Sequence, residues 1–404
     1  MTAVSTPSPS LHILPEVAAI KDEVFENRRF FHAHPELSFQ EVATAAKIAE
    51  LLRSYGLTEV IEKVGKTGVV GIIRGGEPGA CIGLRADMDA LPIQETASVP
   101  YCSKNAGVMH ACGHDGHMAG LLAAAKILHA ERAKLAGVIK LIFQPAEEGL
   151  GGASEMIKDG VLEEGVLGPK VDEVYGLHLW SYEGLGLVGC REGPMMAASD
   201  RFEIHVHGKG GHGAAPQGTV DAIVEAAHLV TALHTVVSRN KDPLEQGVLT
   251  VGMIKGGYNY NVIADHVEVA GTCRSFNTNT QELIKSRMEQ ICCGIATTFG
   301  GKIDMDYHYG YPPTINAYPE CVERVNAAAA KIVGRDAAAK PWTTMGAEDF
   351  SYFLQHRPGC FFFVGSSLGG EVRPHHKSIF DFDEVAILVG ASIFVELIRD
   401  LLKA

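Results

Sequence analysis

The sequence predicts an α/β fold with two domains, and three observations lead to this prediction. A chain of 404 residues is too long for one compact core and fits two domains better than one. Up to about Gly193, strands, glycine-rich loops and helices alternate, which is typical of an α/β sheet. Further along, the elements follow the β-α-β-β-α-β order of a ferredoxin-like unit. We therefore predict a discontinuous larger domain, residues 1–195 and 311–404, with a smaller domain, residues 196–310, inserted into it.

Hydrophobic spacing, and the residues that interrupt it, place the elements of the larger domain. Val17, Ile20 and Val24 share one helical face, and Gly56 ends the second helix. Short apolar runs indicate the strands. On these grounds we expect helices at 15–29, 41–55, 117–135, 322–333 and 385–398, and strands at 69–73, 81–84, 138–143 and 360–364.

The smaller domain begins where alternation replaces the earlier pattern. Residues from Arg201 to His207 alternate as a half-buried strand does, and those from Asp221 to Ser238 have the spacing of an amphipathic helix. The remaining elements are expected as strands at 247–254, 266–273 and 302–308 and a helix at 281–299.

Charge and cysteine usage exclude several classes of protein. The formal net charge of −13 argues against nucleic acid or an anionic membrane as the main partner, because both need clustered basic surface. The nine cysteines form no C-x-x-C pair, so a reducing compartment is the simpler interpretation. The N-terminus lacks the pattern of a signal peptide, and polar residues interrupt the apolar stretch from Val385 to Ile398. We expect a cytoplasmic protein.

The densest group of chemically active side chains lies between Met109 and His117. One thiol, three imidazoles and a carboxylate fall within nine residues, directly before a predicted helix. Imidazole and thiolate are the usual ligands of zinc and similar ions. Cys112 and His114 can face one point across Gly113. The alternative is a polar loop whose histidines bond to nearby backbone.

A second group, Gln144-Pro-Ala-Glu-Glu-Gly, follows the strand predicted to end at Phe143. Adjacent carboxylates at a strand end cannot point the same way. One of the two could therefore bind a cation while its neighbour holds a water as general base. An exposed Glu-Glu pair in a loop is the alternative.

Three further positions carry weaker signals. His178 ends an apolar stretch, where a lone histidine is more often structural than a ligand. His375-His376 forms a pair in a loop. Asp87 and Asp89 follow a buried strand, where an aspartate can orient a ligating histidine or cap the next helix.

Taken together, these motifs resemble the M20 metallopeptidase and amidohydrolase family, in the branch of hippurate hydrolase, auxin-conjugate hydrolases and related N-acyl-amino-acid amidohydrolases. The matching motifs occur in the family's order and span nearly the whole chain. They are His32–Leu37, Arg85–Pro92, Cys112–His117, Gln144–Gly149, Gly211–Pro216, Asn261–Ile263 and Gly346–Ser351.

The resemblance implies two divalent metal ions per subunit and a general acid/base, Glu147. Zinc or manganese is expected, with cobalt or nickel as alternatives, because ligand type alone does not select the metal. The family's last ligand lies five residues before the aspartate of its D-F motif, which selects His376 over His375; Ser378 stands where relatives carry a proline. The implied ligands are Cys112, His114, Glu148, His178 and His376.

For the rest of the site, the resemblance implies residues from both domains. Arg85 replaces a ligating histidine of the wider family, so Cys112 would compensate and Asp87 would keep only an orienting role. His212 would stabilise the oxyanion, and Asn261 and Arg274 would bind the substrate carboxylate. A homodimer is implied as well.

The activity implied is hydrolysis of the amide bond of N-acyl or N-aroyl amino acids. Two alternatives stay open. One is a dipeptidase or carboxypeptidase that acts on unblocked peptides, because the loops that form the acyl pocket cannot be derived from sequence. The other is a non-catalytic binding protein of the same fold, against which the Glu147-Glu148 pair argues, because a binder needs no base beside a ligand.

Overall fold

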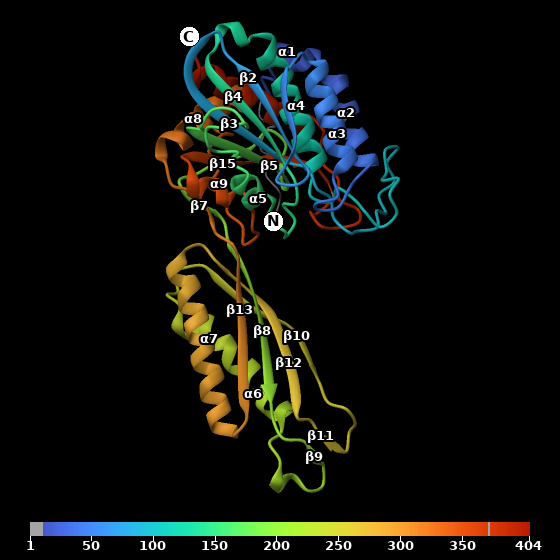
Figure 1. The fold of residues 1–404 in the computed structure, drawn as a ribbon, viewed down its shortest axis with the longest axis vertical. Helices are drawn as coiled ribbons and strands as arrows, with labels where there is room; N and C mark the ends of the chain where they lie inside the picture. The colour runs from blue at the N-terminus through green and yellow to red at the C-terminus, as the bar shows by residue number, and fades with distance from the viewer. Residues whose placement is uncertain (1–10, 371) are drawn as a thin grey trace. The chain divides into compact units, whose positions relative to one another are not determined.

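A computed structural model describes residues 11–370 and 372–404. The chain divides into two compact units (Figure 1). The first consists of the described residues up to Met195 together with Ile315–Trp342 and Asp349–Ala404; the second consists of Met196–Thr314 and Thr343–Glu348. The short strands β7 (Gly193–Met196) and β14 (Thr314–Asn316) lie where the chain passes between the units.

A seven-stranded mixed sheet is the centre of the first unit. Its order is β1-β2-β4-β3-β5-β15-β6. The four strands β4, β3, β5 and β15 are parallel, and the other three run antiparallel to their neighbours. The strands are β1 (Glu59–Val64), β2 (Gly68–Arg74), β3 (Glu77–Asp87), β4 (Ala136–Gln144), β5 (Glu173–Gly184), β6 (Val188–Gly189) and β15 (Gly359–Ser367).

Helices cover this sheet, so its central strands are apolar on both faces. In β15, eight of nine residues are buried, and the strand reads as a continuous apolar run around Phe361–Phe363. A single large core joins residues of α2, α3, α4, α8 and α10 with the strands, while α5 and α9 contact each other. The helices are α1 (Pro15–Ala19), α2 (Lys21–Ala33), α3 (Val42–Ser54), α4 (His114–Ala130), η1 (Arg132–Lys134), α5 (Gly152–Lys158), α8 (Pro319–Val333), α9 (Ser351–His356) and α10 (Val385–Leu401).

The second unit is a four-stranded antiparallel sheet with the order β10-β12-β8-β13. Phe202, Ile204 and Val206 alternate along β8 and pack with residues of α6 and α7 in one core. Its elements are β8 (Ala198–His207), β9 (Gly211–His212), η2 (Pro216–Gly218), α6 (Ala222–Thr235), η3 (Val236–Asn240), β10 (Gly247–Gly256), β11 (Val262–Ile263), β12 (His266–Ser275), α7 (Thr278–Phe299) and β13 (Lys302–Tyr311). The prediction of an α/β protein with a β-α-β-β-α-β unit is confirmed.

Several elements differ from expectation: β5, α5 and α9 were given no bounds from the sequence, and α4 begins at His114, earlier than expected. Two further differences have a local cause. The first predicted helix is two helices, because the chain leaves helical geometry at Ile20, where ψ is 14°. Strand β1 was not predicted: it is an edge strand with only Val64 buried, and its exposed glutamate and lysine hide the apolar signal. No helix of the described residues is long and apolar enough to cross a membrane.

Candidate metal centre

Three parallel strands bring the predicted ligands to one edge of the larger sheet. Strand β3 ends at Asp87 and its neighbour β4 at Gln144, and His178 lies within the next strand, β5. Because the carboxyl ends of parallel strands meet at one edge, the polar residues there converge although they are distant in sequence.

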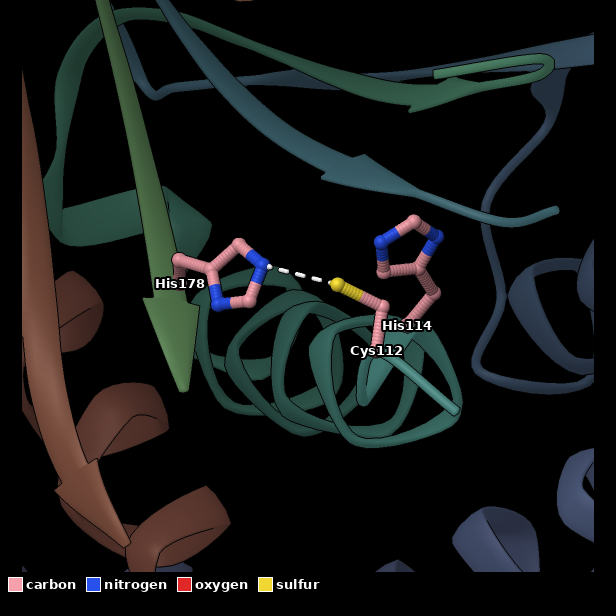
Figure 2. Close-up of side chains that lie close together, drawn as sticks. All are labelled: Cys112, His114 and His178. Carbon is pink, nitrogen blue, oxygen red and sulfur yellow. Dashed lines mark hydrogen bonds between the residues drawn. The ribbon is translucent and has the colours of Figure 1, made fainter. Parts of the chain in front are cut away.

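Cys112, His114 and His178 form a buried group (Figure 2). Gly113 has a φ of 94° at the N-cap of α4, a left-handed conformation that glycine adopts without steric cost. The turn directs Cys112 and His114 toward His178 on β5, and one ligand atom from each lies within 4.8 Å of the other two. The Cys112 Sγ is 3.4 Å from His178 Nε2.

The tautomers of the two histidines leave the same ring atom available. Nδ1 of His114 donates to the carbonyl of Asp89 at 2.9 Å, and Nδ1 of His178 donates to the carbonyl of Leu179 at 2.6 Å. A carbonyl can only accept, so each Nδ1 carries a proton. Nε2 is then the atom of each ring that can bind a cation, which is the usual arrangement of a ligating histidine.

Glu147 and Glu148 follow β4 in a tightly constrained loop. Ala146, directly before them, has a φ of 54°, which is uncommon for a residue other than glycine. Gly152 permits this path, because a Cβ at that position would lie 1.7 Å from the Pro145 carbonyl oxygen. The two carboxylates lie with His114 in one group of ligand atoms within 4.8 Å of one another.

His376 completes a third group with Cys112 and Glu148. Its Nε2 is 3.4 Å from Oε1 of Glu148, and its side chain is 54% exposed. Its φ of 60° is held by the backbone N–H, which donates to the Ala111 carbonyl at 2.8 Å. The neighbouring His375 is buried and accepts the Ser181 N–H on Nε2 at 3.1 Å.

Asp87 orients a histidine outside the predicted ligand set. Its carboxylate accepts from Nδ1 of His117 at 2.6 Å and from Nη1 of Arg85 at 2.8 Å. Nε2 of His117 accepts the Leu179 N–H at 2.9 Å. Both ring nitrogens of His117 are therefore engaged, and this histidine supports the base of the site.

The donor set fits a divalent cation. Nε2 of His114 and Oε1 of Glu148 are buried and have no hydrogen-bond partner among the described residues. Buried polar atoms are normally bonded, and a cation held by sulfur, nitrogen and oxygen would satisfy both. Thiolate, imidazole and carboxylate are the ligands that zinc and related ions take in proteins.

The protonation of the metal-free cluster supports the same conclusion. Burial, followed by the charges of Glu148 and Glu147, raises the pKa of the Cys112 thiol well above its usual range. Burial lowers the pKa of His114, but the carboxylates of Asp87, Asp89 and Glu148 outweigh it and raise that pKa to about 10. Without a cation, protons neutralise the cluster, and a bound cation would replace them.

The remaining predicted residues belong to the second unit. His212 and Asn261 line one surface depression of 490 Å³, where β9 and β11 pair. Nδ1 of His212 accepts the Ala214 N–H at 3.0 Å, so the neutral ring carries its proton on the exposed side, at Nε2. Arg274 lies on β12 and donates to the Cys273 carbonyl at 3.0 Å and to the Thr272 hydroxyl.

Sequence analysis did not assign His117 and Glu41 to the site. His117 lies inside the densest motif, but its spacing could not separate a ligand from a supporting side chain. Glu41 is buried and accepts the Ala146 N–H at 2.9 Å, and no local pattern marks it. Asp89 had two candidate roles; the structure shows its carbonyl accepting from His114 and its carboxylate accepting the N–H groups of Glu147 and Glu148.

The chain is similar to several known proteins over most of its length. The model of Peptidase family M20/M25/M40 matches residues 83–400. The chain is 47% identical over 301 residues to an N-acyl-L-amino acid amidohydrolase of Geobacillus stearothermophilus. This match covers 74% of this chain and 80% of that protein. It is 42% identical over 382 residues to thermostable carboxypeptidase 2 of Saccharolobus solfataricus, covering 93% of this chain and 94% of the relative.

A solved structure shares the same architecture. The Bacillus subtilis protein YXEP, described as a dinuclear metal binding peptidase of the M20 family, superposes with a TM-score of 0.82 at 34% identity. The match covers 95% of this chain and 99% of that one.

Proposed function

Because this chain belongs to peptidase family M20/M25/M40 and is thus a metallohydrolase acting on amide bonds, we propose that it hydrolyses N-acyl or N-aroyl L-amino acids. The products would be a carboxylic acid and a free amino acid. The single observation that carries this proposal is the position of Glu147: a carboxylate lies beside Glu148 in one group with His114. A site that only binds a metal has no need of this second carboxylate.

We propose that Cys112, His114, Glu148, His178 and His376 hold two divalent cations. The support is the convergence of these side chains in overlapping groups and the dinuclear centre of the related B. subtilis peptidase. When bound, such ions lower the pKa of a coordinated water toward neutrality and polarise the substrate carbonyl.

Glu147 is the residue that moves the proton. Its carboxylate would take a proton from the attacking water and later deliver it to the leaving amine, as a general base and then a general acid. The backbone of the loop is held by Asp89, which accepts the N–H of Glu147 at 3.0 Å. This bond fixes the position of the base before substrate arrives.

For the second unit, the proposal rests on the family resemblance. His212 would donate from Nε2 to the developing oxyanion, and Asn261 and Arg274 would bind the carboxylate of the amino acid. The assembly of two chains into a homodimer remains a prediction of the same kind.

A second candidate activity is cleavage of unblocked peptides from the carboxyl end. It is favoured by the 42% identity to a thermostable carboxypeptidase, which extends over 93% of this chain. Both activities use the same attack on an amide carbonyl, and they differ in whether the pocket accepts an acyl group or a charged α-amino group.

One activity panel tests both candidates. Hippurate, several N-acetyl amino acids and the matching dipeptides are incubated with the protein as purified, after chelation, and after return of zinc or manganese. The proposal expects hydrolysis of the N-acyl substrates that chelation removes and metal restores. Hydrolysis of the dipeptides alone would favour the carboxypeptidase, and no hydrolysis by the metal-loaded protein of any substrate would reject both.

A further inference from the structure

A second group of imidazoles lies on one face of the sheet in the second unit. His205 and His207 alternate with Ile204 and Val206, which face the core with α6 and α7. They therefore point to the opposite face. Pairing of β8 with β12 sets His207 opposite His266.

The same register sets Glu268 opposite His205. The rings of His205 and His266 are nearly parallel, with centroids 5.7 Å apart and an interplanar angle of 13°. The rings of His207 and His266 are 5.2 Å apart. One ligand atom from each of His205, His266 and Glu268 lies within 4.8 Å of the other two. Neighbouring strands thus gather two nitrogens and a carboxylate oxygen around one point.

Asp304 of β13 lies opposite His205 and interacts with it through its charge, which adds a carboxylate beside this group. Among the described residues, His205, His266 and Glu268 form no side-chain hydrogen bond and no ion pair, and all three are half-buried. His207 forms an ion pair with the same aspartate, through Nε2 at 3.4 Å from Oδ2 of Asp304. The neutral imidazole ring is the form that binds a metal.

The backbone beneath the group is well fixed. Strands β8 and β12 are the two central strands of the sheet and pair without a shift in register over ten residues. Ligands placed on rigid strands lose little freedom when they bind. Nitrogen and oxygen atoms bound to one zinc at about 2.0–2.2 Å lie roughly 3.3 Å apart. Side-chain rotations that bring the ligand atoms closer to one another by about 1.5 Å or less would give that spacing.

We propose that His205, His266 and Glu268 bind one zinc ion, at a site separate from the centre around Cys112. Two imidazoles and a carboxylate form a ligand set that zinc takes readily, and a water or His207 can fill the fourth position. The ion would link the two central strands of the second unit. Its expected effect is on the stability of that unit, since none of the three residues belongs to the proposed hydrolytic machinery.

The test counts zinc in matched variants of the full chain with any affinity tag removed. Wild type, H266A, E268Q and H234A are equilibrated in the same buffered free zinc, and bound zinc per chain is measured by elemental mass spectrometry. His234 is exposed on α6 and serves as the control. The centre around Cys112 is identical in all four proteins. A difference in bound zinc therefore comes from the group of His205, His266 and Glu268.

We expect H266A to bind one zinc fewer per chain than wild type and H234A, at free zinc that saturates wild type. The isosteric E268Q should weaken the affinity for that zinc by at least about 10-fold. Loss of a residue that only supports a metal ligand already costs this much. Hydrolytic activity of each variant, expected to equal that of wild type, shows that the chain is folded. Equal zinc in wild type, H266A and E268Q would overturn the proposal.

Discussion

The carboxylate of Asp89 accepts the backbone N–H of Glu147 at 3.0 Å through Oδ1. Its other oxygen accepts the N–H of Glu148, also at 3.0 Å, and the hydroxyl of Ser38 at 2.7 Å. A residue just after β3 thereby fixes the loop that follows β4. Glu147, the proposed general base, and Glu148, a proposed metal ligand, are thus positioned through the backbone, and both side chains stay available to the site.

Replacing Asp89 by Asn should therefore reduce turnover. An amide has one acceptor oxygen, so one of the two N–H groups would face an NH2 group and stay unsatisfied, at a cost of about 1–3 kcal/mol. We expect kcat to fall by about 5- to 150-fold, since about 1.4 kcal/mol is a factor of ten in rate. Steady-state kinetics on the best substrate measures this fall in kcat, with S38A as the control. Wild-type kcat in D89N would contradict the positioning role.

Mutation of the two adjacent glutamates should have different effects on metal content and on kcat. E147Q should keep its metal and lose about 10²–10⁴-fold in kcat, the usual contribution of a general base. E148Q should lose metal, because it removes the carboxylate near both Cys112 and His376. Metal content by elemental analysis beside kcat distinguishes the two. An E147Q protein with unchanged kcat would refute its assignment.

The sequence allowed much of this arrangement to be predicted, because its local patterns are strong. The alternation of Arg201–His207 and the order of the following elements correspond to β8 through β13. The motifs ending at Glu148 and around Cys112 lie together at one sheet edge, as expected for parallel strands. The roles of these residues remain proposals.

What could not be predicted depends on contacts between distant residues. His117 is a supporting side chain because its Nε2 accepts the N–H of Leu179, which is 62 residues away in the sequence. The Glu41 carboxylate reaches Ala146 across 105 residues. Edge strand β1 has charged side chains, so its pairing with β2, and not its own pattern, makes it a strand.

Cys112 should govern which metal the centre prefers. Its sulfur is the soft donor of the group with His114 and His178, and soft donors favour zinc over manganese. We expect C112S to lose more affinity for zinc than for manganese. Competition with a chromophoric chelator measures both constants, and C102S, a half-buried cysteine outside the cluster, is the control. Equal loss for the two metals would argue against a sulfur ligand.

His32 should contribute stability that disappears as pH rises. Burial lowers its pKa, but hydrogen bonds to Asp115 at 2.8 Å and Glu95 at 3.1 Å outweigh it, so the net shift is upward. The folded state thus binds this proton more tightly than the unfolded state. The contribution is complete below the unfolded pKa of about 6.5 and is lost as pH passes the raised folded value.

The measurement is urea unfolding of the metal-free protein at several pH values for wild type and H32Q. The difference in free energy of unfolding should be largest below about pH 6.5 and should shrink above it. H234Q, which changes an exposed histidine, should show no such trend. A difference that grows with pH would mean that His32 folds in its neutral form.

Arg85 should be the most costly single residue to remove from the base of the site. Its guanidinium is fully buried and bonds to Asp87 at 2.8 Å, Asp349 at 3.1 Å and Gln144 at 2.8 Å. R85M would leave two buried carboxylates without their cation, and breaking a buried pair in this way costs about 3–5 kcal/mol. The exposed pair of Arg74 and Glu59 has equally short bonds, at 2.7 and 2.8 Å.

R74M is therefore the matched control, since exposed pairs contribute about 0–1 kcal/mol. Unfolding by urea at neutral pH should show R85M destabilised by several times the change in R74M. Because Asp87 also holds His117 at 2.6 Å, R85M should disturb the centre even where the chain stays folded. Similar losses in the two variants would mean that solvent or a rearranged carboxylate compensates for Arg85, and that burial of this pair has little energetic consequence.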